Sequence, residues 1–145
     1  MKGVKIKKIS DANIQEIVDI WYETSIQSHY FIPNDYWKVN KSLMKEKYIP
    51  MSETYVATDG KILLGFVSMI DEYLAAIFVR TEYQNEGAGS QLLDYIKDIR
   101  DRIQLKVYKK NEKGIKFYKN KGFIVVSTSI DKETGEKELV MEWNR

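Results

Sequence analysis

A glycine-rich junction near the middle of the chain most constrains the fold. The apolar run from Leu74 to Val79 predicts a buried strand, and the small, polar stretch from Gln84 to Ser90 predicts a loop. The residues beyond the loop recur on one apolar face at helical spacing: Leu92, Leu93, Ile96 and Ile99. The chain therefore contains a strand, loop, helix unit, which requires a sheet with a helix packed on its face.

The loop ends where the predicted helix begins, and this placement leaves backbone amides free. The first amides of a helix have no internal partner, and the peptide dipoles add positive potential there, so such an end binds phosphate well. Gly87 and Gly89 lack the Cβ atoms that would keep a phosphate at a distance. Strand-to-helix turns also use glycine for steric reasons alone, so the loop by itself leaves both interpretations open.

The neighbouring residues exclude two common nucleotide sites. The loop does not end in Gly-Lys-Ser/Thr, as the phosphate loop of an NTPase does, and no Gly-x-Gly-x-x-Gly follows a strand near the N-terminus. The sequence therefore disfavours a P-loop NTPase and a Rossmann domain.

The remaining elements surround this unit in a regular order. Strands are predicted at residues 4–9, 54–58, 62–70, 74–79, 103–107, 123–130 and 139–143. Two helices lie between the first two strands, the second of them ending before Pro50, and a short helix runs from Asn111 to Gly122. The order predicts an α/β fold with a mixed sheet and helices on both faces, in a single domain over residues 1–145.

Composition excludes several classes of protein. The balance of 43% apolar and 30% charged residues is that of a globular chain, and a net charge of +2 gives no general attraction to nucleic acid or an anionic membrane. The chain has no cysteine, which excludes disulfides, thiolate metal sites and a cysteine nucleophile. Since no secretion signal or run of 18 apolar residues is present, we expect a cytoplasmic protein without a metal.

Two sequence blocks carry a family resemblance. Gln84-Asn85-Glu86-Gly87-Ala88-Gly89 resembles the acetyl-CoA motif of the GNAT superfamily of N-acetyltransferases, and Asn111 with the block from Phe117 to Phe123 resembles that superfamily's second motif. The segment from Ile17 to Ile32 is similar to a small bacterial subgroup of uncharacterised members. The resemblance implies a GNAT-like fold with a mostly antiparallel central sheet, and acetyl-CoA as co-substrate.

The resemblance also implies which residues bind acetyl-CoA. The backbone of Ile77, Phe78 and Val79 would pair with the pantetheine arm, and the Asn111 side chain would reach it from the exit of the next strand. The diphosphate would be held by the loop residues Gln84, Asn85, Glu86, Gly87, Ala88, Gly89 and Ser90. Asn85 and Glu86 stand where glycine and a basic residue are frequent in the superfamily, and a carboxylate disfavours a diphosphate unless it points to water.

Tyr118 in the second block is the predicted general acid. A phenol with a reference pKa near 10 is protonated at neutral pH and can donate its proton to the departing thiolate of coenzyme A. The alternative is that Tyr118 only packs, as most of the ten tyrosines of the chain must.

The acceptor amine must lose a proton before it attacks, so a base or a chain of waters is required. His29, the only histidine, is a candidate because the resemblance places its segment over the acceptor site; Glu23 and Glu72 are alternatives. A loop histidine that is merely solvated or packed is the other interpretation. The backbone N–H of Phe78 or Val79 would stabilise the oxyanion.

The aromatic residues of the two-helix region suggest an acceptor pocket. Helical spacing places Trp21 in the core, so Tyr30 and Phe31, in the loop, are the predicted pocket walls.

The sequence thus predicts direct acetyl transfer from acetyl-CoA to an unidentified amine, by a monomer or homodimer that binds neither nucleic acid nor membrane. A non-catalytic acyl-CoA sensor on the same fold is the alternative. The lysines between Lys109 and Lys121 could meet the 3′-phosphate of coenzyme A. A third hypothesis, RNA binding by these lysines, has little support because such clusters are usually solvated.

Overall fold

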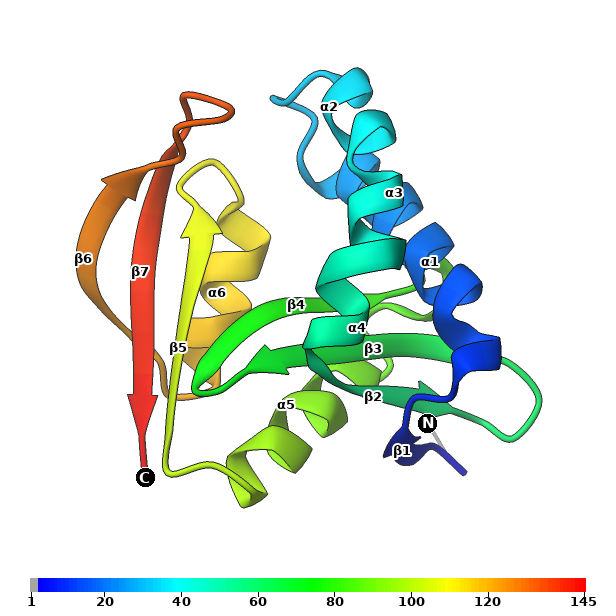
Figure 1. Cartoon of the computed structure of the whole chain (residues 1–145). Helices are drawn as coiled ribbons and strands as arrows, with labels where there is room; N and C mark the ends of the chain where they lie inside the picture. Colours follow the sequence, from blue (N-terminus) through cyan, green and yellow to red (C-terminus); the bar gives the residue numbers. More distant parts are fainter. Residues whose placement is uncertain (1–2) are drawn as a thin grey trace.

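The computed structural model describes residues 3–145, which form a seven-stranded mixed sheet (Figure 1). The strands lie in the order β1-β2-β3-β4-β5-β7-β6. Their bounds are β1 Lys5–Lys8, β2 Glu53–Thr58, β3 Leu63–Ile70, β4 Tyr73–Val79, β5 Arg102–Tyr108, β6 Ile124–Ile130 and β7 Lys137–Asn144. All neighbouring strands are antiparallel except β4 and β5, so the predicted mostly antiparallel α/β sheet is confirmed.

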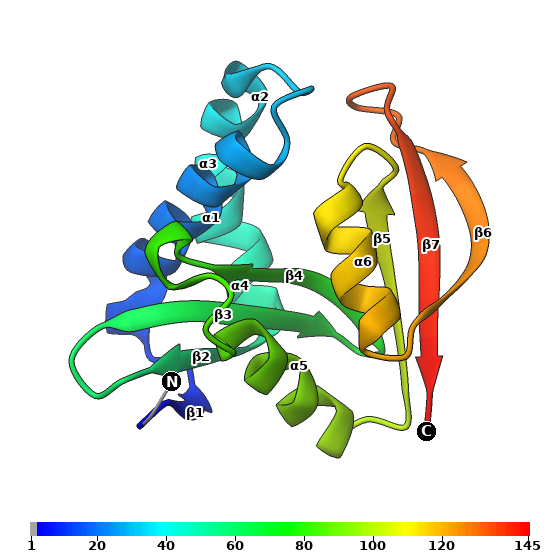
Figure 2. The same cartoon turned by 180° about the vertical axis from the view of Figure 1, so that it is seen from behind.

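Helices cover both faces of the sheet (Figures 1 and 2). One face carries α1 (Ile14–Ser28), α2 (Asn34–Val39), α3 (Lys41–Leu43) and α4 (Ile49–Met51). The opposite face carries α5 (Ala88–Asp98) and α6 (Glu112–Asn120). Each layer buries its own apolar cluster, and β3 contributes Phe66 to the first and Leu64 to the second. This two-sided burial explains why β3 is a nearly continuous apolar run.

The predicted end of the second helix before Pro50 is wrong. Helical turns continue from Asn34 to Met51 as α2, α3, a π-helical segment at Met44–Tyr48, and α4. The Ile49 N–H bonds back to the Met44 carbonyl, and Pro50 is the second residue of α4. In the first turn of a helix a backbone N–H is not required, so the proline is accommodated there.

The sheet splits between β4 and β5. These parallel strands pair only at Tyr73 and Gln104, and they diverge toward their C-terminal ends (Figure 1). A bulge adds to the irregularity, because Ser68 and Met69 of β3 face Ala76 and Leu74, which leaves Ala75 without a partner residue. The edge of β4 that faces β5 is consequently free of strand pairing from Leu74 to Val79.

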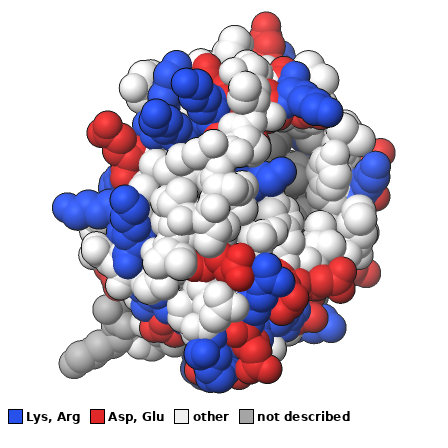
Figure 3. Space-filling view, turned by 90° about the vertical axis from the view of Figure 1, so that its left-hand side faces the viewer, with Lys and Arg blue, Asp and Glu red and all other residues white. Residues whose placement is uncertain are grey.

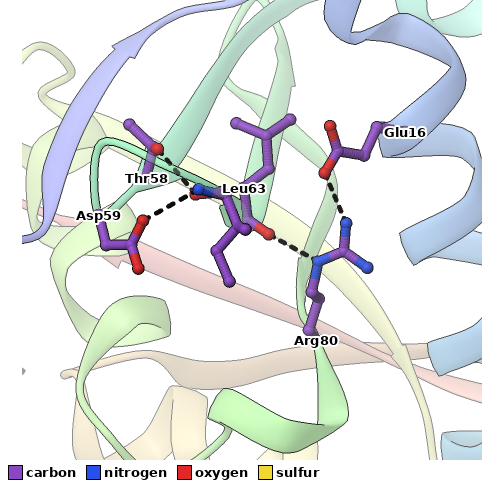
Figure 4. A network of polar contacts seen from close by, with 6 residues as sticks. Glu16, Thr58, Asp59, Leu63 and Arg80 are labelled. Carbon is purple, nitrogen blue, oxygen red and sulfur yellow. Dashed lines mark hydrogen bonds and ion pairs between the residues drawn. The ribbon is translucent and has the colours of Figure 1, made fainter.

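Arg80 fixes the chain at the end of β4, where the glycine-rich loop begins (Figure 4). Its Nε donates to the Leu63 carbonyl at 2.6 Å, and its Nη2 lies 2.6 Å from the Glu16 carboxylate of α1. Its backbone N–H also donates to the Leu64 carbonyl at 2.8 Å. Arg80 therefore ties α1, β3 and the start of the loop together.

We expect Arg80→Met to lower the free energy of unfolding by about 1–3 kcal/mol, because a charge-assisted bond to a carbonyl is lost together with the ion pair. Glu16→Gln should cost less than about 1 kcal/mol, since the Glu16 side chain is 41% exposed and solvent screens the pair. Urea unfolding measures the loss of unfolding free energy in each of the two variants. Equal losses would contradict the assignment of the main contribution to the Leu63 carbonyl.

Candidate active site

The split between β4 and β5 holds a cavity of about 680 Å³, called the central cavity below. Its walls come from α1, β4, the loop after β4, β5, α6 and β7. A hollow with a basic side chain inside it is visible on the side of the molecule shown in Figure 3. Eight of the predicted site residues line the central cavity: His29, Ile77, Phe78, Val79, Gln84, Asn85, Asn111 and Tyr118.

The rest of the predicted site forms the start of α5. Gly87 is the residue before α5 and has a φ of 95°, a left-handed conformation that favours glycine. A Cβ placed there would meet no atom within 4 Å, so the glycine serves the backbone conformation and leaves open space. No side chain caps the helix, so the amides of Ala88, Gly89 and Ser90 are left without an intrahelical partner.

Gly89 differs from Gly87 in its surroundings. A Cβ at this position would face Val79 and Phe117 at 3.5–3.7 Å, which is ordinary van der Waals contact. The absent side chain of Gly89 therefore faces the wall between β4 and α6, and the role of this glycine toward a phosphate stays a prediction.

Two side chains hold the loop in place. Gln84 Nε2 donates to the Val79 carbonyl at 3.1 Å, which braces the loop against the end of β4. Lys121 Nζ donates to Ser90 Oγ at 2.8 Å and lies 2.6 Å from the Asp94 carboxylate. The second motif thus brings a cation to the start of α5. Glu86 is exposed, as a carboxylate near a bound anion must be.

Tyr118 lines the central cavity from α6. Its ring packs against Phe117 and Phe123, with centroids 5.4 and 5.7 Å away. Among residues 3–145 no hydrogen-bond partner of its hydroxyl is found. Burial, and to a smaller degree the nearby Tyr73, raise the pKa of Tyr118 well above its usual value. The phenol is therefore fully protonated at neutral pH and unengaged.

Asn111 caps α6 from inside the cavity wall. Its Oδ1 accepts a hydrogen bond from the Gly114 N–H at 3.0 Å. Its Nδ2 lies 3.5 Å from Nε2 of His29. A Cβ on Gly114 would lie only 2.6 Å from this Nδ2, so the glycine makes room for the cap. The Asn111 side chain, which is predicted to contact pantetheine, thus already has Gly114 and His29 as partners.

His29 is buried at the C-terminal end of α1, with 7% of its surface exposed. Its ring stacks on Trp37 at 5.2 Å and meets the Tyr108 ring edge-on at 5.1 Å. Burial lowers the pKa of His29 to about 4. The imidazole is therefore neutral at physiological pH, and with that pKa it holds an abstracted proton poorly.

The buried imidazole makes stability depend on pH. Below pH 6.5 the unfolded chain binds a proton at His29 that the folded protein does not, so stability falls as the pH drops from 6.5 to about 4. A shift of this size corresponds to about 3 kcal/mol. We expect wild type to lose about that much more than His29→Gln over this range, measured by urea unfolding. Parallel pH curves for the two proteins would contradict the depressed pKa.

The chain resembles known acetyltransferases in sequence. Residues 50–125, more than half of the chain, match the family profile of the acetyltransferase (GNAT) domain. The chain belongs to the GNAT family. It is also 30% identical over 139 residues, 95% of both chains, to the peptidyl-lysine N-acetyltransferase YiaC of Escherichia coli (strain K12). The peptidyl-lysine N-acetyltransferase YjaB of Salmonella typhimurium is 23% identical over 134 residues, 92% of both chains.

Solved structures show the same GNAT fold. The solution structure of apo-form YjaB from Escherichia coli superposes with a TM-score of 0.85 at 22% identity, covering 96% of each chain. The PaiA N-acetyltransferase from Thermoplasma acidophilum, solved in complex with coenzyme A, gives a TM-score of 0.83 at 20% identity, covering 98% of this chain and 99% of that one. The predicted family and fold are confirmed, and the chain is an acyl-CoA-dependent N-acetyltransferase.

The acceptor side of this GNAT protein differs from the predicted one. Tyr30 and Phe31 do not line the central cavity, and Tyr30 is 78% exposed. Trp21 of α1 and Trp37 of α2 line it instead, since the faces of these helices that enter the core also reach the split in the sheet. The spacing of residues along one helix shows which side chains face the core, but it does not show whether that face also borders a cavity.

The alternative bases lie elsewhere. Glu23 and Glu72 are both exposed and outside the cavity lining, and Glu72 faces Arg102 at 3.9 Å. The cavity wall contains two lysines of the predicted cluster, Lys113 and Lys116. It also contains four ionisable residues that the sequence did not indicate: Tyr73, Lys106, Tyr108 and Glu138.

Two further features of the described part of this GNAT chain concern ions and membranes. Within residues 3–145, no three His, Asp or Glu side chains are grouped closely enough to hold a metal ion. In the same range, no helix is both long and apolar enough to span a bilayer.

Proposed function

We propose that the protein transfers the acetyl group of acetyl-CoA directly to the Nε amine of a lysine side chain in a peptide or protein. The observation that carries the proposal is the central cavity, which extends from the loop residues Gln84 and Asn85, shortly before α5, to aromatic walls and has Tyr118 in its lining. The acceptor class follows the relatives YiaC and YjaB, which are named peptidyl-lysine N-acetyltransferases.

The donor half of the cavity fits acetyl-CoA. The free amides of Ala88 to Ser90 and the positive end of the α5 dipole suit the diphosphate, and Lys121 adds a charge beside them. The unpaired edge of β4 from Ile77 to Val79 offers backbone groups to the pantetheine amides. We propose that Gln84 to Ser90 hold the diphosphate, and that Asn111 contacts the pantetheine.

The acceptor half fits a lysine side chain. Trp21, Trp37, Tyr73 and Tyr108 provide apolar walls for its four methylenes and aromatic faces for its ammonium. The neutral amine would attack the thioester carbonyl, the C–N bond would form, and a backbone N–H of Phe78 or Val79 would stabilise the oxyanion. The C–S bond would then break, and the Tyr118 hydroxyl would give its proton to the thiolate.

We propose that residues 1–145 act as one acetyltransferase domain, since one continuous sheet organises all described elements. The proposal keeps the predicted monomer or homodimer and the predicted cytoplasmic location. Family membership favours this enzyme over the acyl-CoA sensor, and the six lysines between 109 and 121 give no separate support to RNA binding: Lys110 and Lys121 are ion-paired, and Lys113 and Lys116 line the cavity.

Thiol release from acetyl-CoA tests the acceptor class. The panel contains a peptide with one lysine and a blocked α-amine, the same peptide with arginine in place of lysine, an unblocked peptide without lysine, and spermidine. We expect thiol release and a mass gain of one acetyl group with the lysine peptide alone. Release with the unblocked peptide or with spermidine alone would overturn the lysine assignment.

A further inference from the structure

Glu138 is the only acidic residue in the wall of the central cavity. It lies on β7, directly opposite Tyr108 of β5 in the strand register, and Tyr108 is one of the aromatic residues that line the same cavity. Within residues 3–145 its carboxylate makes no hydrogen bond or ion pair. A carboxylate that is partly buried without a partner is costly to keep, so its presence in a substrate cavity indicates a chemical role.

The other acidic residues near this wall are already engaged. Asp131 accepts a hydrogen bond from the Tyr108 hydroxyl at 2.7 Å, and Glu133 accepts one from the Tyr36 hydroxyl at 2.6 Å. Glu136 lies 3.2 Å from Nζ of Lys110. Glu138 is thus the one member of this group of four that is free to meet a substrate cation.

We propose that Glu138 is the catalytic residue that binds the ammonium group of the acceptor lysine and accepts its proton before the amine attacks. The inference rests on the proposed function, because it concerns the same reaction at the same cavity. It assigns the base to a cavity residue other than the earlier candidates His29, Glu23 and Glu72.

The position of Glu138 relative to Tyr118 supports the assignment. Tyr73 of β4 interacts electrostatically with both residues: the Glu138 charge raises the pKa of Tyr73, and Tyr73 raises that of Tyr118. Tyr73 on β4, Tyr118 on α6 and Glu138 on β7 all line the central cavity. In the proposed reaction Glu138 accepts a proton and Tyr118 donates one.

The surroundings of Glu138 suit a base that works near neutral pH. Burial, and then the charge of Asp131, raise the pKa of Glu138, while Lys106 of β5 lowers it. Tyr73 of β4 and Tyr108 of β5 are the other titratable groups that face it, and both have raised pKa values. A carboxylate with a raised pKa accepts a proton more readily than an exposed one.

Glu138 and Tyr118 together account for all the proton transfers of the reaction. The lysine ammonium gives one proton to the Glu138 carboxylate, and the neutral amine forms the C–N bond. As the C–S bond breaks, Tyr118 gives its proton to the thiolate and recovers one from the nitrogen of the new amide. Glu138 then releases its proton to water, so the net products are the acetyl-lysine, coenzyme A thiol and one proton.

Glu138→Gln tests the proposal, with Glu142→Gln as the matched control. Glu142 lies on the same strand, outside the cavity wall, and pairs with Arg102 at 2.7 Å. At pH 7.5 we expect kcat/KM for the single-lysine peptide to fall about 10²-fold in Glu138→Gln and less than about twofold in Glu142→Gln. Acetyl-CoA affinity, measured by calorimetry, should be unchanged in both variants.

Two readouts separate a base from a merely structural residue. Neutral lysine becomes about tenfold more abundant with each pH unit below its pKa near 10.4, so the deficit of Glu138→Gln should shrink steadily toward pH 9.5. The deficit should also shrink at pH 7.5 for a peptide that carries S-aminoethylcysteine, whose amine is less basic than lysine. Thermal unfolding at pH 8 should show no loss of stability, because the variant removes a partly buried charge.

The outcomes are distinct. Activity of Glu138→Gln within twofold of wild type at pH 7.5 would overturn the proposal, as would a deficit that stays constant with pH and with amine basicity. If wild type binds acetyl-CoA and acetylates no lysine peptide, the proposed function fails, and the assignment of Glu138 fails with it. A wild type that is active on lysine together with an unimpaired variant refutes Glu138 alone.

Discussion

Replacing Tyr118 by phenylalanine should lower kcat about 10³-fold and leave the affinity for acetyl-CoA unchanged. The substitution removes only the hydroxyl, which has no hydrogen-bond partner among residues 3–145, so packing against Phe117 and Phe123 is retained. Without the proton donor the thiolate must leave as an anion, which raises the barrier of the step in which the C–S bond breaks.

Tyr95→Phe is the matched control for this loss. Tyr95 lies on α5, packs beside Tyr55, and is not part of the cavity wall. Initial rates of thiol release give kcat, and calorimetry gives the dissociation constant of acetyl-CoA. If Tyr118→Phe and Tyr95→Phe behaved alike, or if Tyr118→Phe weakened acetyl-CoA binding in proportion to the lost rate, Tyr118 would have no role as an acid.

Replacing Gly87 by aspartate should weaken acetyl-CoA binding about 10³-fold. The new carboxylate would stand at the start of α5, about 4 Å from the diphosphate, where two like charges repel by about 4 kcal/mol at an effective dielectric constant near 20. It would also offer the free helix amides an acceptor within the chain, in competition with the phosphate. Both effects act on the bound state of the donor and leave the remote acceptor wall untouched.

Gly87→Asn separates charge from backbone strain. Asparagine has the shape of aspartate, and both tolerate the left-handed conformation at this position better than other side chains do. Calorimetry with acetyl-CoA should therefore show a loss of less than tenfold for the asparagine variant, and circular dichroism should show both variants folded. Equal losses in the two variants would mean that the loop conformation, and not the positive potential of the helix end, determines affinity.

The donor half of the site could be predicted because it depends on local sequence. The strand, the loop and the helix that follow one another from Leu74 to Asp98 are neighbours along the chain, and the left-handed turn at Gly87 is a backbone property that only a few residues permit. Tyr118, the proposed general acid, also lies inside a short block, close to Asn111, which caps the same helix. The periodicity of apolar residues and the spacing of motifs are sufficient to predict such units from the sequence.

The acceptor half depends on contacts that spacing does not specify. β7 inserts between β5 and β6, which brings Glu138 opposite Tyr108 and into the cavity wall. Glu138 and Tyr108 are 30 positions apart, and nothing in either strand alone identifies the partner. For the same reason the sequence placed Tyr30 in the pocket, although the tertiary packing of α1 and α2 gives that role to Trp21 and Trp37.

Local context also explains the remaining errors. Pro50 predicts a helix end when only its missing N–H is considered, yet the π-helical segment before it moves the proline into the first turn of α4. His29 lies in a predicted loop, where an imidazole is normally solvated, but the rings of Trp37 and Tyr108 bury it. In both cases the environment, and not the residue type, determines the outcome.

A crystal structure of the protein with coenzyme A is the most direct test of this account. We predict the diphosphate on the amides of Ala88 to Ser90, the pantetheine along the free edge of β4, and the sulfur within hydrogen-bond reach of the Tyr118 hydroxyl. Coenzyme A bound with its sulfur outside the split between β4 and β5, or with its diphosphate away from the start of α5, would contradict the account.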